Sequence, residues 1–461
     1  MTDYRSRARE TVRRKLAAAL VREGLTPADV SPSLAAELRD AEEKLALAYE
    51  RRQAADRQAR EPALSHSVVR LEQLATDGHN LHPCGRTRLG WTIGDAIAHD
   101  LESPGTAVRF VGVPVEWAVG DDLGERLGVA APRGHRAQPV HEWQLGVVRR
   151  RYPDLPVLDE RWDANVTAAV RTLWVPRLDA FLKLSLDVQI TSTRRTISIA
   201  STRNGPRLSA ILPGLLAQCS ERVELLREPA GAAAALGSGR DLSAILRDPL
   251  PPLGPGEVAV PAIALGATDP VTGTTLIDQL VRQDGRGPAA FLDDYARLLL
   301  APVLGLATRF GVGLEAHLQN CIVTFTGGRP ARLILRDLAG LRLHAGRMAD
   351  ASIDVGLWPG SVVGTDHEGV LLAKVAYTAV QAHLGEVVAR LDLEPYAAWR
   401  RVRAVVDEIY AGLASAVPMA AKADYAFLTA PAVPHKALVR MRLEDRGDIY
   451  VPMENPLHEP A

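Results

Sequence analysis

The spacing of apolar residues changes along the chain, and this change constrains the fold more than any other sequence feature. Within residues 1–60 apolar residues recur at steps of three or four, which predicts two helices. From about residue 105, short apolar runs alternate with Gly and Pro, and residues 184–190 alternate strictly between apolar and polar, which predicts a half-buried strand. Helical patterns return from about 290 and over 367–418. This order favours an α+β fold over a doubly wound sheet.

The same patterns predict three regions. We expect a helical N-terminal region over 1–100, a region with an antiparallel sheet over 101–262, and a mainly helical C-terminal region over 263–461. Residues 229–262 are rich in Ala, Gly and Pro, and we expect them to form a loop or a boundary between lobes. A chain of 461 residues agrees with about three units of roughly 150 residues each.

The composition excludes several classes of partner. Lys and Arg number 54 and Asp and Glu 55, so the formal charge of -1 gives no overall attraction to nucleic acid or anionic lipid. Aromatic residues make up only 5%, which argues against a surface that stacks on single-stranded bases. The apolar runs are shorter than the roughly 20 residues that a membrane span needs. We therefore expect neither a nucleic acid nor a membrane as partner.

The cysteines and the N-terminus indicate a cytoplasmic protein. Cys84, Cys219 and Cys321 are odd in number, far apart and without metal-binding spacing, which favours reduced thiols. The first residues are rich in Arg and lack the apolar segment of a secretory signal.

A first polar cluster lies in the loop His82-Pro83-Cys84-Gly85-Arg86-Thr87-Arg88-Leu89-Gly90. Its backbone N–H groups and the guanidinium groups of Arg86 and Arg88 suit the oxygens of phosphate or carboxylate. A structural turn with solvated arginines is the alternative.

A second polar cluster, residues 191–196, directly follows the predicted strand. Its hydroxyl and guanidinium groups can cradle an anion at a strand end, and the residues concerned are Ser192, Thr193, Arg195 and Thr196. Arg203 and Arg207 follow within reach of the same sheet. A polar strand that simply continues outward is the alternative, because Thr favours strands.

A third polar cluster, Glu315-Ala316-His317-Leu318-Gln319-Asn320, precedes an apolar run, and Gly327-Gly328 then predicts a hairpin turn. Folding the chain at this turn returns Asp337 to the level of about residue 318. Gln319, Asn320 and Asp337 therefore meet at one end of the hairpin. Carboxylate and amide oxygens suit a Mg²⁺ ion that also takes water and phosphate oxygens. The alternative is that these polar residues only cap the hairpin.

The common nucleotide, zinc-protease and serine-hydrolase motifs are absent from the sequence, since no GxxxxGK[ST], GxGxxG, HExxH or GxSxG occurs. Two anion cradles and one predicted Mg²⁺ site nevertheless indicate a nucleoside triphosphate whose charge is neutralised from several sides.

In this order the three clusters resemble the IucA/IucC (aerobactin synthetase) family, the siderophore synthetases (NIS synthetases) that work without nonribosomal peptide synthetases. The family pattern HPxxKxRxG is similar to residues 82–90, KLSLxxxxTSxxRT to residues 183–196, and EAHxQN with a following RD to residues 315–337. Weaker similarities lie at 245–247 and 436–443. The matches run in family order from about 79 to 457.

The resemblance implies a cupped-hand α+β fold of three lobes (thumb, fingers and palm), with ATP and Mg²⁺ as cofactors. It implies that a carboxylic acid, citrate-like or another polycarboxylate, is adenylated with release of pyrophosphate. An amine, hydroxylamine or alcohol then displaces AMP, in the biosynthesis of a siderophore or a related natural product.

The resemblance also implies roles for individual residues. Those expected to act in catalysis are His317, Arg195 and Glu315. Those expected to bind ATP are His82, Arg86, Arg88, Ser192, Thr193, Arg195, Thr196, Arg207 and Gln319. Those expected to hold the metal are Asn320, Asp337 and Glu315.

The sequence departs from the family pattern in three ways. Arg86 stands where Lys is usual, Glu142 stands where Pro is usual in an HPWQ-like run, and the chain is shorter than the usual member. An ADP-forming small-molecule phosphotransferase and a non-catalytic paralogue that binds a pathway intermediate are the alternatives. The acid, the nucleophile, the choice between amide and ester, and homodimerisation are left open by the sequence.

Overall fold

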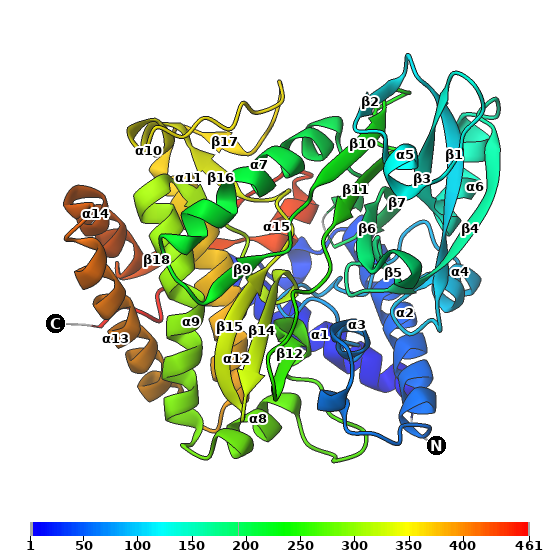
Figure 1. The fold of residues 1–461 in the computed structure, drawn as a ribbon. Coiled ribbons are helices and arrows are strands. Elements are labelled where there is room, and N and C mark those ends of the chain that lie inside the picture. Colours follow the sequence, from blue (N-terminus) through cyan, green and yellow to red (C-terminus); the bar gives the residue numbers. More distant parts are fainter. Residues whose placement is uncertain (1–2, 192, 460–461) are drawn as a thin grey trace.

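The computed structural model describes residues 3–191 and 193–459, which form an α+β fold with two principal sheets (Figure 1). The predicted fold class is confirmed. The N-terminal helices lie below the larger sheet in this view, and the C-terminal helices α13 (Pro395–Leu413) and α14 (Pro418–Leu428) lie on the opposite side of the molecule.

The N-terminal region consists of helices, as predicted. They are α1 (Tyr4–Glu23), α2 (Pro32–Asp56), α3 (Val68–Glu72) and α4 (Ile93–His99), with 3₁₀ turns at Pro27–Asp29 and Ala63–Ser65. Asp3 caps α1 by accepting from two backbone N–H groups, and Gly24 ends it in the left-handed conformation at φ 63°. The apolar residues that predicted α2, from Leu34 to Ala48, are buried.

The larger sheet has eight strands in the order β2-β10-β11-β6-β5-β4-β1-β3, and every pair in it is antiparallel. Its strands are β1 (Thr106–Pro114), β2 (Ala118–Gly120), β3 (His135–His141), β4 (Val157–Val166), β5 (Thr172–Val175), β6 (Ala180–Leu184), β10 (Ala230–Ala234) and β11 (Ser243–Arg247). The helices of this region are α5 (Leu123–Leu127), α6 (Glu142–Arg151) and α7 (Ile199–Ala217), with a 3₁₀ turn at Pro176–Leu178.

The predicted loop over 229–262 is wrong for much of its length, because β10, β11 and β12 (Glu257–Pro261) lie in it. The Ala-Gly run forms a strand because α7 crosses it closely. A Cβ added at Gly231 would lie 2.2 Å from the Thr202 carbonyl oxygen, so only glycine fits there. The Pro-rich stretch 248–256 does remain irregular.

The predicted strand at 184–190 is divided into two strands at Ser185. β6 belongs to the large sheet, whereas β7 (Leu186–Ile190) pairs with β8 (Thr193–Arg195) in a two-stranded ribbon and forms one further bridge from Gln189 to Leu89. The predicted alternation is confirmed, since Leu184, Leu186, Val188 and Ile190 are all buried.

The second sheet has the order β12-β14-β15-β9, and its strands besides β12 are β9 (Val223–Leu225), β14 (Cys321–Thr326) and β15 (Arg329–Leu335). β14 and β15 form the predicted hairpin, with Gly327 and Gly328 at φ 55° and 80°. β9 and β12 come from the middle of the chain and extend the hairpin on both sides. The division of the chain into three lobes stays a prediction.

The C-terminal region is mainly helical, as expected. Its helices are α8 (Leu276–Asp284), α9 (Pro288–Phe310), α10 (Ala345–Asp350), α11 (Glu368–Val375), a π-helix (Ala376–Leu384), α12 (Gly385–Arg390), α13 (Pro395–Leu413), α14 (Pro418–Leu428) and α15 (Leu438–Leu443), with 3₁₀ turns at Ala262–Ala264 and Leu318–Asn320. Short strands complete it at β13 (Val312–Gly313), β16 (Arg342–His344), β17 (Gly364–Thr365), β18 (Ala432–Lys436) and β19 (Tyr450–Glu454).

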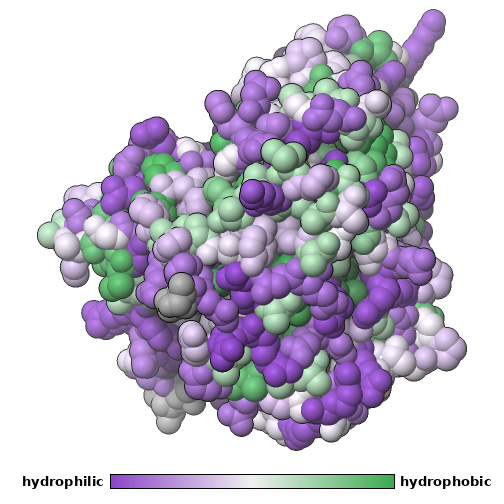
Figure 2. Space-filling view, turned by 90° about the vertical axis from the view of Figure 1, so that its left-hand side faces the viewer, coloured by the Kyte–Doolittle hydropathy of each residue, from purple (hydrophilic) through white to green (hydrophobic). Residues whose placement is uncertain are grey.

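Helix α9 runs through the largest hydrophobic cluster of the molecule. Pro288 begins this helix and Gly311 ends it at φ 69°. On the face shown in Figure 2, apolar residues are scattered among hydrophilic ones. Within the described part of the chain, no helix is both long enough and apolar enough to cross a membrane.

Candidate active site

Asp337 lies where the hairpin meets the large sheet, and cations from that sheet surround it. Lys183 of β6, which is 0% exposed, donates from Nζ to the Asp337 carboxylate at 2.6 Å. Arg247 of β11 lies 3.4 Å from the same carboxylate and 2.7 Å from Glu228. Burial opposes ionisation of Asp337, but Lys183, Arg247 and Arg171 hold its pKa well below the usual range. The carboxylate is therefore anionic at neutral pH.

Arg171 and Arg195 lie on the other side of this cluster. Arg171 donates to the backbone carbonyls of Arg195 and Thr196 at 3.0 and 3.2 Å, and so fixes the end of β8. Arg195 donates to the Ile190 carbonyl and to the Thr191 hydroxyl at 3.1 and 2.9 Å. Burial, and then Arg171 and Arg88, lower the pKa of Arg195 to about 9, while Asp337 and Glu315 act against this shift. Residues from distant segments thus act on one guanidinium.

We call Lys183, Arg171, Arg195 and Arg247 the central cations. Their carboxylate neighbours within the described residues are Asp337 and Glu228, while Glu315 also acts on Arg195 from a distance. Four positive charges thus face two negative ones at close range. Buried charge is costly unless it is compensated, so this arrangement favours binding of an anion.

Two histidines lie beside the central cations and are uncharged. His82 accepts from the Cys84 backbone N–H at 2.9 Å, and burial, followed by Arg195, lowers the pKa of His82 to about 3. His317 precedes the 3₁₀ turn at Leu318–Asn320, and burial lowers its pKa, although Glu315 and Asp337 oppose this. A neutral imidazole can accept a proton, which makes His317 a candidate base.

A second group of charges surrounds Glu315. Lys374 of α11 lies 2.7 Å from its carboxylate. Burial raises the pKa of Glu315, but the Lys374 cation outweighs this and the pKa is lowered to about 2. Asp448 contacts Lys436 at 2.6 Å and also pairs with Arg342. Cationic side chains from α11, β16 and β18 therefore gather on this side of His317.

The end of the hairpin is built as the sequence predicts. Arg336 donates from its backbone N–H to the Asn320 carbonyl at 3.0 Å, so Asn320 and Asp337 reach the same end of the hairpin. The Arg336 guanidinium also donates to the Gln319 carbonyl at 3.0 and 2.7 Å. The Asn320 amide donates to the Glu315 carbonyl at 3.1 Å, which closes the turn.

Other expected ATP-binding residues make contacts within the protein. Arg86 lies 2.6 Å from Glu102 and 3.3 Å from Asp100, and Arg88 lies 2.9 Å from Asp100. All four of these side chains are buried. The charges of Arg86 and Arg88 are thus paired within the protein, which argues against phosphate binding by these two side chains. Their contact with ATP stays a prediction.

The remaining expected residues lie at the edge of the site or apart from it. The Thr196 hydroxyl accepts from Arg240, Thr193 is exposed, and Arg207 donates to the Gly356 carbonyl on α10's side of the molecule. Ser192 lies outside the described residues. The structure therefore brings Arg195, His317, Glu315 and Asp337 together with His82, while Arg207 contacts a different segment.

The predicted metal ligands do not form a protein cage. In the described ranges, no group of three or more His, Cys, Asp or Glu side chains is placed to hold an ion. Glu315 and Asp337 are each bound to a lysine. A Mg²⁺ ion at Asp337 and Asn320 would take its other ligands from water and phosphate, as Mg²⁺ commonly does. Metal binding stays a prediction.

Several residues of the site were given no role at the level of sequence, among them Lys183, Arg171, Arg247, Lys374 and Lys436, although Lys183, Arg247 and Lys436 lie in stretches that resemble the family. Lys183 and Lys374 each stand alone in an apolar run, FLKLSL and LLAKVAY. A lone lysine in a buried strand or helix needs a carboxylate partner, and this is the signal that could have identified both.

Comparison with known proteins bears on the family and on the fold. The model of the IucA / IucC family matches residues 67–267, which include the central cations. A model described as ferric iron reductase FhuF-like transporter matches residues 289–451, which include Glu315 to Asp337.

Among curated proteins, the chain is similar to two from Staphylococcus aureus (strain NCTC 8325 / PS 47). It is 23% identical to staphyloferrin A synthase over 431 residues, which are 84% of this chain and 72% of that protein. It is 28% identical to D-ornithine--citrate ligase over 465 residues, with 85% of this chain and 70% of that protein covered.

Solved structures of the same fold include two biosynthetic proteins. The petrobactin biosynthesis protein AsbB from Bacillus anthracis str. Sterne matches with a TM-score of 0.79 and 21% identity, covering 94% of this chain and 80% of that one. ATP-bound aerobactin synthetase IucA from a hypervirulent pathotype of Klebsiella pneumoniae matches with a TM-score of 0.77 and 20% identity, covering 100% and 88%. The cupped-hand synthetase fold is thereby confirmed. The resemblance to the IucA/IucC family is thus supported by its model over residues 67–267 and by similarity of most of the chain to siderophore synthetases.

Proposed function

We propose that the protein is an ATP-dependent ligase that adenylates a polycarboxylic acid and joins it to an amine or a related nucleophile. The observation that carries this proposal is the excess of positive charge around Asp337, on two buried and two half-buried side chains. Lys183, Arg171, Arg195 and Arg247 lack enough nearby carboxylates to balance them, and a triphosphate supplies the missing negative charge. The relatives support it, since their names pair citrate with ornithine, 2,3-diaminopropanoate or spermidine.

In the first step a carboxylate oxygen of the acid attacks the α-phosphorus of ATP. The bond from this phosphorus to the bridging oxygen of the β-phosphate breaks, and pyrophosphate leaves. Two anions must approach each other, so the central cations lower the barrier by cancelling charge before the reacting atoms meet. Mg²⁺ bound to the phosphates would add further neutralisation.

In the second step the nucleophile attacks the acyl carbon, and AMP leaves with the electrons of the acyl–oxygen bond. An amine must lose a proton before or during attack. His317 is uncharged because burial lowers its pKa. The carboxylates of Glu315 and Asp337 oppose this shift and would stabilise the imidazolium that forms when His317 takes up a proton. It is therefore the group we assign to accept this proton.

Two cationic side chains near His317 could pair with the carboxylates of the acid that do not react. Lys374 and Lys436 lie on this side of the site, and both act on His317. The buried Lys374 and the half-buried Lys436 beside the reacting position favour a substrate with more than one carboxylate over a monocarboxylic acid.

The test is pyrophosphate release from ATP over a panel of acids, including citrate, succinyl derivatives, 2-oxoglutarate and amino acids. We expect release that depends on one acid and on Mg²⁺. Arg195→Ala and Asp337→Ala should each lower the rate by about 10²–10³, whereas Lys422→Ala, at an exposed position on α14, should not.

The products decide between this function and its alternatives. AMP and pyrophosphate support the ligase. ADP as the product would indicate a phosphotransferase instead, and ATP binding without turnover over the whole panel would indicate a non-catalytic paralogue. Full adenylation activity in Asp337→Ala would contradict the assignment of the site.

A further inference from the structure

Arg240 is an arginine at the edge of the site that the sequence motifs do not include. It lies in the turn between β10 and β11, after Gly237 and Gly239, which have φ 53° and 66°. Its carbonyl accepts from the Ser185 hydroxyl at 2.6 Å, and the same hydroxyl accepts from the Ile197 backbone N–H at 3.0 Å. The backbone of Arg240 is therefore fixed against the β7–β8 ribbon.

The side chain of Arg240 reaches the second polar cluster. Its Nε donates to the Thr196 hydroxyl at 3.2 Å. Its charge also acts on Arg171. Burial is the largest cause that lowers the pKa of Arg171, and the cations of Arg247 and Arg240 lower it further. Arg240 thus stands next to the central cations, on the exposed side of Thr196.

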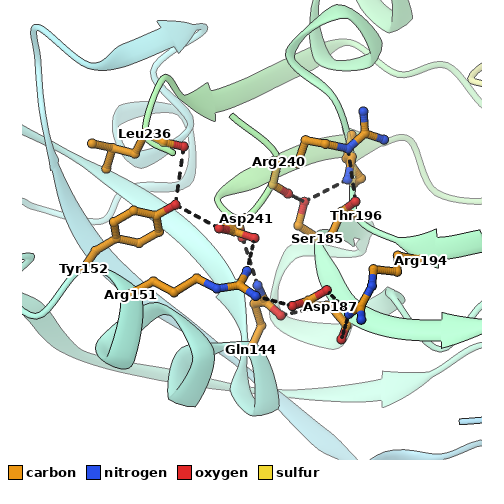
Figure 3. A network of polar contacts seen from close by, with 11 residues as sticks. Gln144, Arg151, Tyr152, Ser185, Asp187, Arg194, Thr196, Leu236, Arg240 and Asp241 are labelled. Atoms are coloured by element: carbon orange, nitrogen blue, oxygen red, sulfur yellow. Dashed lines mark hydrogen bonds and ion pairs between the residues drawn. The ribbon is translucent and has the colours of Figure 1, made fainter. Parts of the chain in front are cut away.

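The carboxylates near Arg240 are bound to other cations. Asp187 lies 2.6 Å from Arg151 and 2.6 Å from Arg194. Asp241 lies 2.6 Å from Arg151 and accepts from the Tyr152 hydroxyl at 2.8 Å. Figure 3 shows the terminal nitrogens of Arg240 directed away from this network. Within the described part of the chain, Arg240 has no ion-pair partner.

An exposed arginine held through Nε keeps both terminal nitrogens available for a second ligand. A guanidinium presents these nitrogens as a fork that matches two oxygens of one phosphate. Arg240 and Arg171 carry like charges and repel each other, and an anion bound between them would offset this repulsion. An anion here would therefore be shared by Arg240 and the central cations.

We propose that Arg240 is a further phosphate-binding residue, which contacts the terminal phosphates of ATP and the pyrophosphate that leaves. This inference rests on the proposed function, because it takes ATP as the ligand. We place the α-phosphate near His317, where the acid reacts, and the outer phosphates at the second polar cluster, where Arg240 contacts Thr196. As the α–β bridging bond breaks, negative charge grows on the departing pyrophosphate, and Arg240 stabilises it.

The test compares how tightly ATP and AMP bind, by isothermal titration calorimetry on the full chain. In Arg240→Ala we expect ATP affinity to fall by about 10- to 100-fold, the range for loss of hydrogen bonds to a charged group. AMP affinity should stay within about twofold, since AMP lacks the outer phosphates. Inhibition by pyrophosphate should weaken in parallel with ATP binding.

Two further variants serve as references. Arg240→Lys keeps the charge but loses the fork, so its ATP affinity should lie between those of wild type and Arg240→Ala. Arg149→Ala removes another exposed arginine, on α6, and should leave ATP affinity unchanged.

Different results overturn different statements. If wild type binds ATP and Arg240→Ala binds it equally well, the assignment of Arg240 is wrong while the proposed function stands. An equal loss of ATP and AMP affinity would also overturn it, because that result indicates a general disturbance of the site. If wild type binds no ATP, the proposed function fails and the assignment fails with it.

Discussion

Asp337 shows how a single backbone conformation directs the chemistry of the site. Its φ of 71° is left-handed, a conformation that Asp tolerates better than most residues. The carboxylate accepts from the Ala339 backbone N–H at 3.2 Å and so stabilises this turn. The chain therefore turns sharply after β15, and the carboxylate faces Lys183 and Arg247 of the large sheet.

His141 makes stability depend on pH. It caps α6 by accepting from the Trp143 backbone N–H at 3.1 Å, and its other ring nitrogen is buried without a hydrogen-bond partner among the described residues. Burial, and then His99, lower the pKa of His141 to about 3, below the unfolded value near 6.5. The stabilisation is present above pH 6.5 and is lost as pH falls. Between pH 7 and 5 the loss is about 2 kcal/mol.

His141→Asn removes this titration and keeps a good helix cap. Urea unfolding at pH 7 and pH 5 measures the effect. The free energy of unfolding of wild type should fall by about 2 kcal/mol more than that of the variant over this interval. Parallel falls in the two proteins would contradict the role of His141.

At the scale of elements, the β14–β15 hairpin was predicted because its turn chemistry is local, whereas β10 was missed. Gly327 and Gly328 provide the positive φ that a tight hairpin needs. The Ala-Gly run of β10 lacks the β-branched and aromatic residues typical of strands. Its conformation depends on the close approach of α7, where the Thr202 carbonyl lies against Gly231. This contact joins residues about 30 positions apart, so it cannot be recognised from the sequence of β10 alone.

The two glycines of the hairpin turn offer a matched pair of variants. A Cβ at Gly328 would lie 2.2 Å from the Leu280 carbonyl oxygen and 2.5 Å from the Asp284 nitrogen of α8, whereas one at Gly327 would meet nothing within 4 Å. Gly327→Ala should cost about 1–2 kcal/mol for the left-handed backbone alone. Gly328→Ala should cost a further 1–3 kcal/mol, approximately, because α8 must shift. Urea unfolding distinguishes them, and equal losses would show that α8 yields freely.

At the scale of the whole molecule, one buried carboxylate joins three segments. Glu72 of α3 is 0% exposed, lies 2.6 Å from Arg336 after β15, and accepts from the Ala168 backbone N–H at 2.7 Å. Arg336 in turn holds the Gln319 carbonyl. The N-terminal helices, the large sheet and the hairpin thus meet beside the candidate active site.

A double-mutant cycle measures this connection. Glu72→Met and Arg336→Met should each lower the free energy of unfolding by about 3–5 kcal/mol, because each leaves a buried charge unpaired. The double variant should lose clearly less than the sum of the two. The exposed pair Asp293 and Arg401 is the control, with an expected coupling below about 1 kcal/mol. Additive losses for Glu72 and Arg336 would contradict the connection.

The sequence by itself determined the elements whose signals are local: the helices of residues 1–60, the alternation at 184–190, the hairpin at 321–335 and the meeting of Asn320 with Asp337. Periodicity and turn residues act over a few positions, so they can be detected without a fold. Only the tertiary structure decided which charges face each other. It paired Arg86 with Glu102 and set Lys183 against Asp337, 154 positions away. Neutralisation of a buried charge depends on whichever side chains packing brings near, and no short stretch of sequence specifies them.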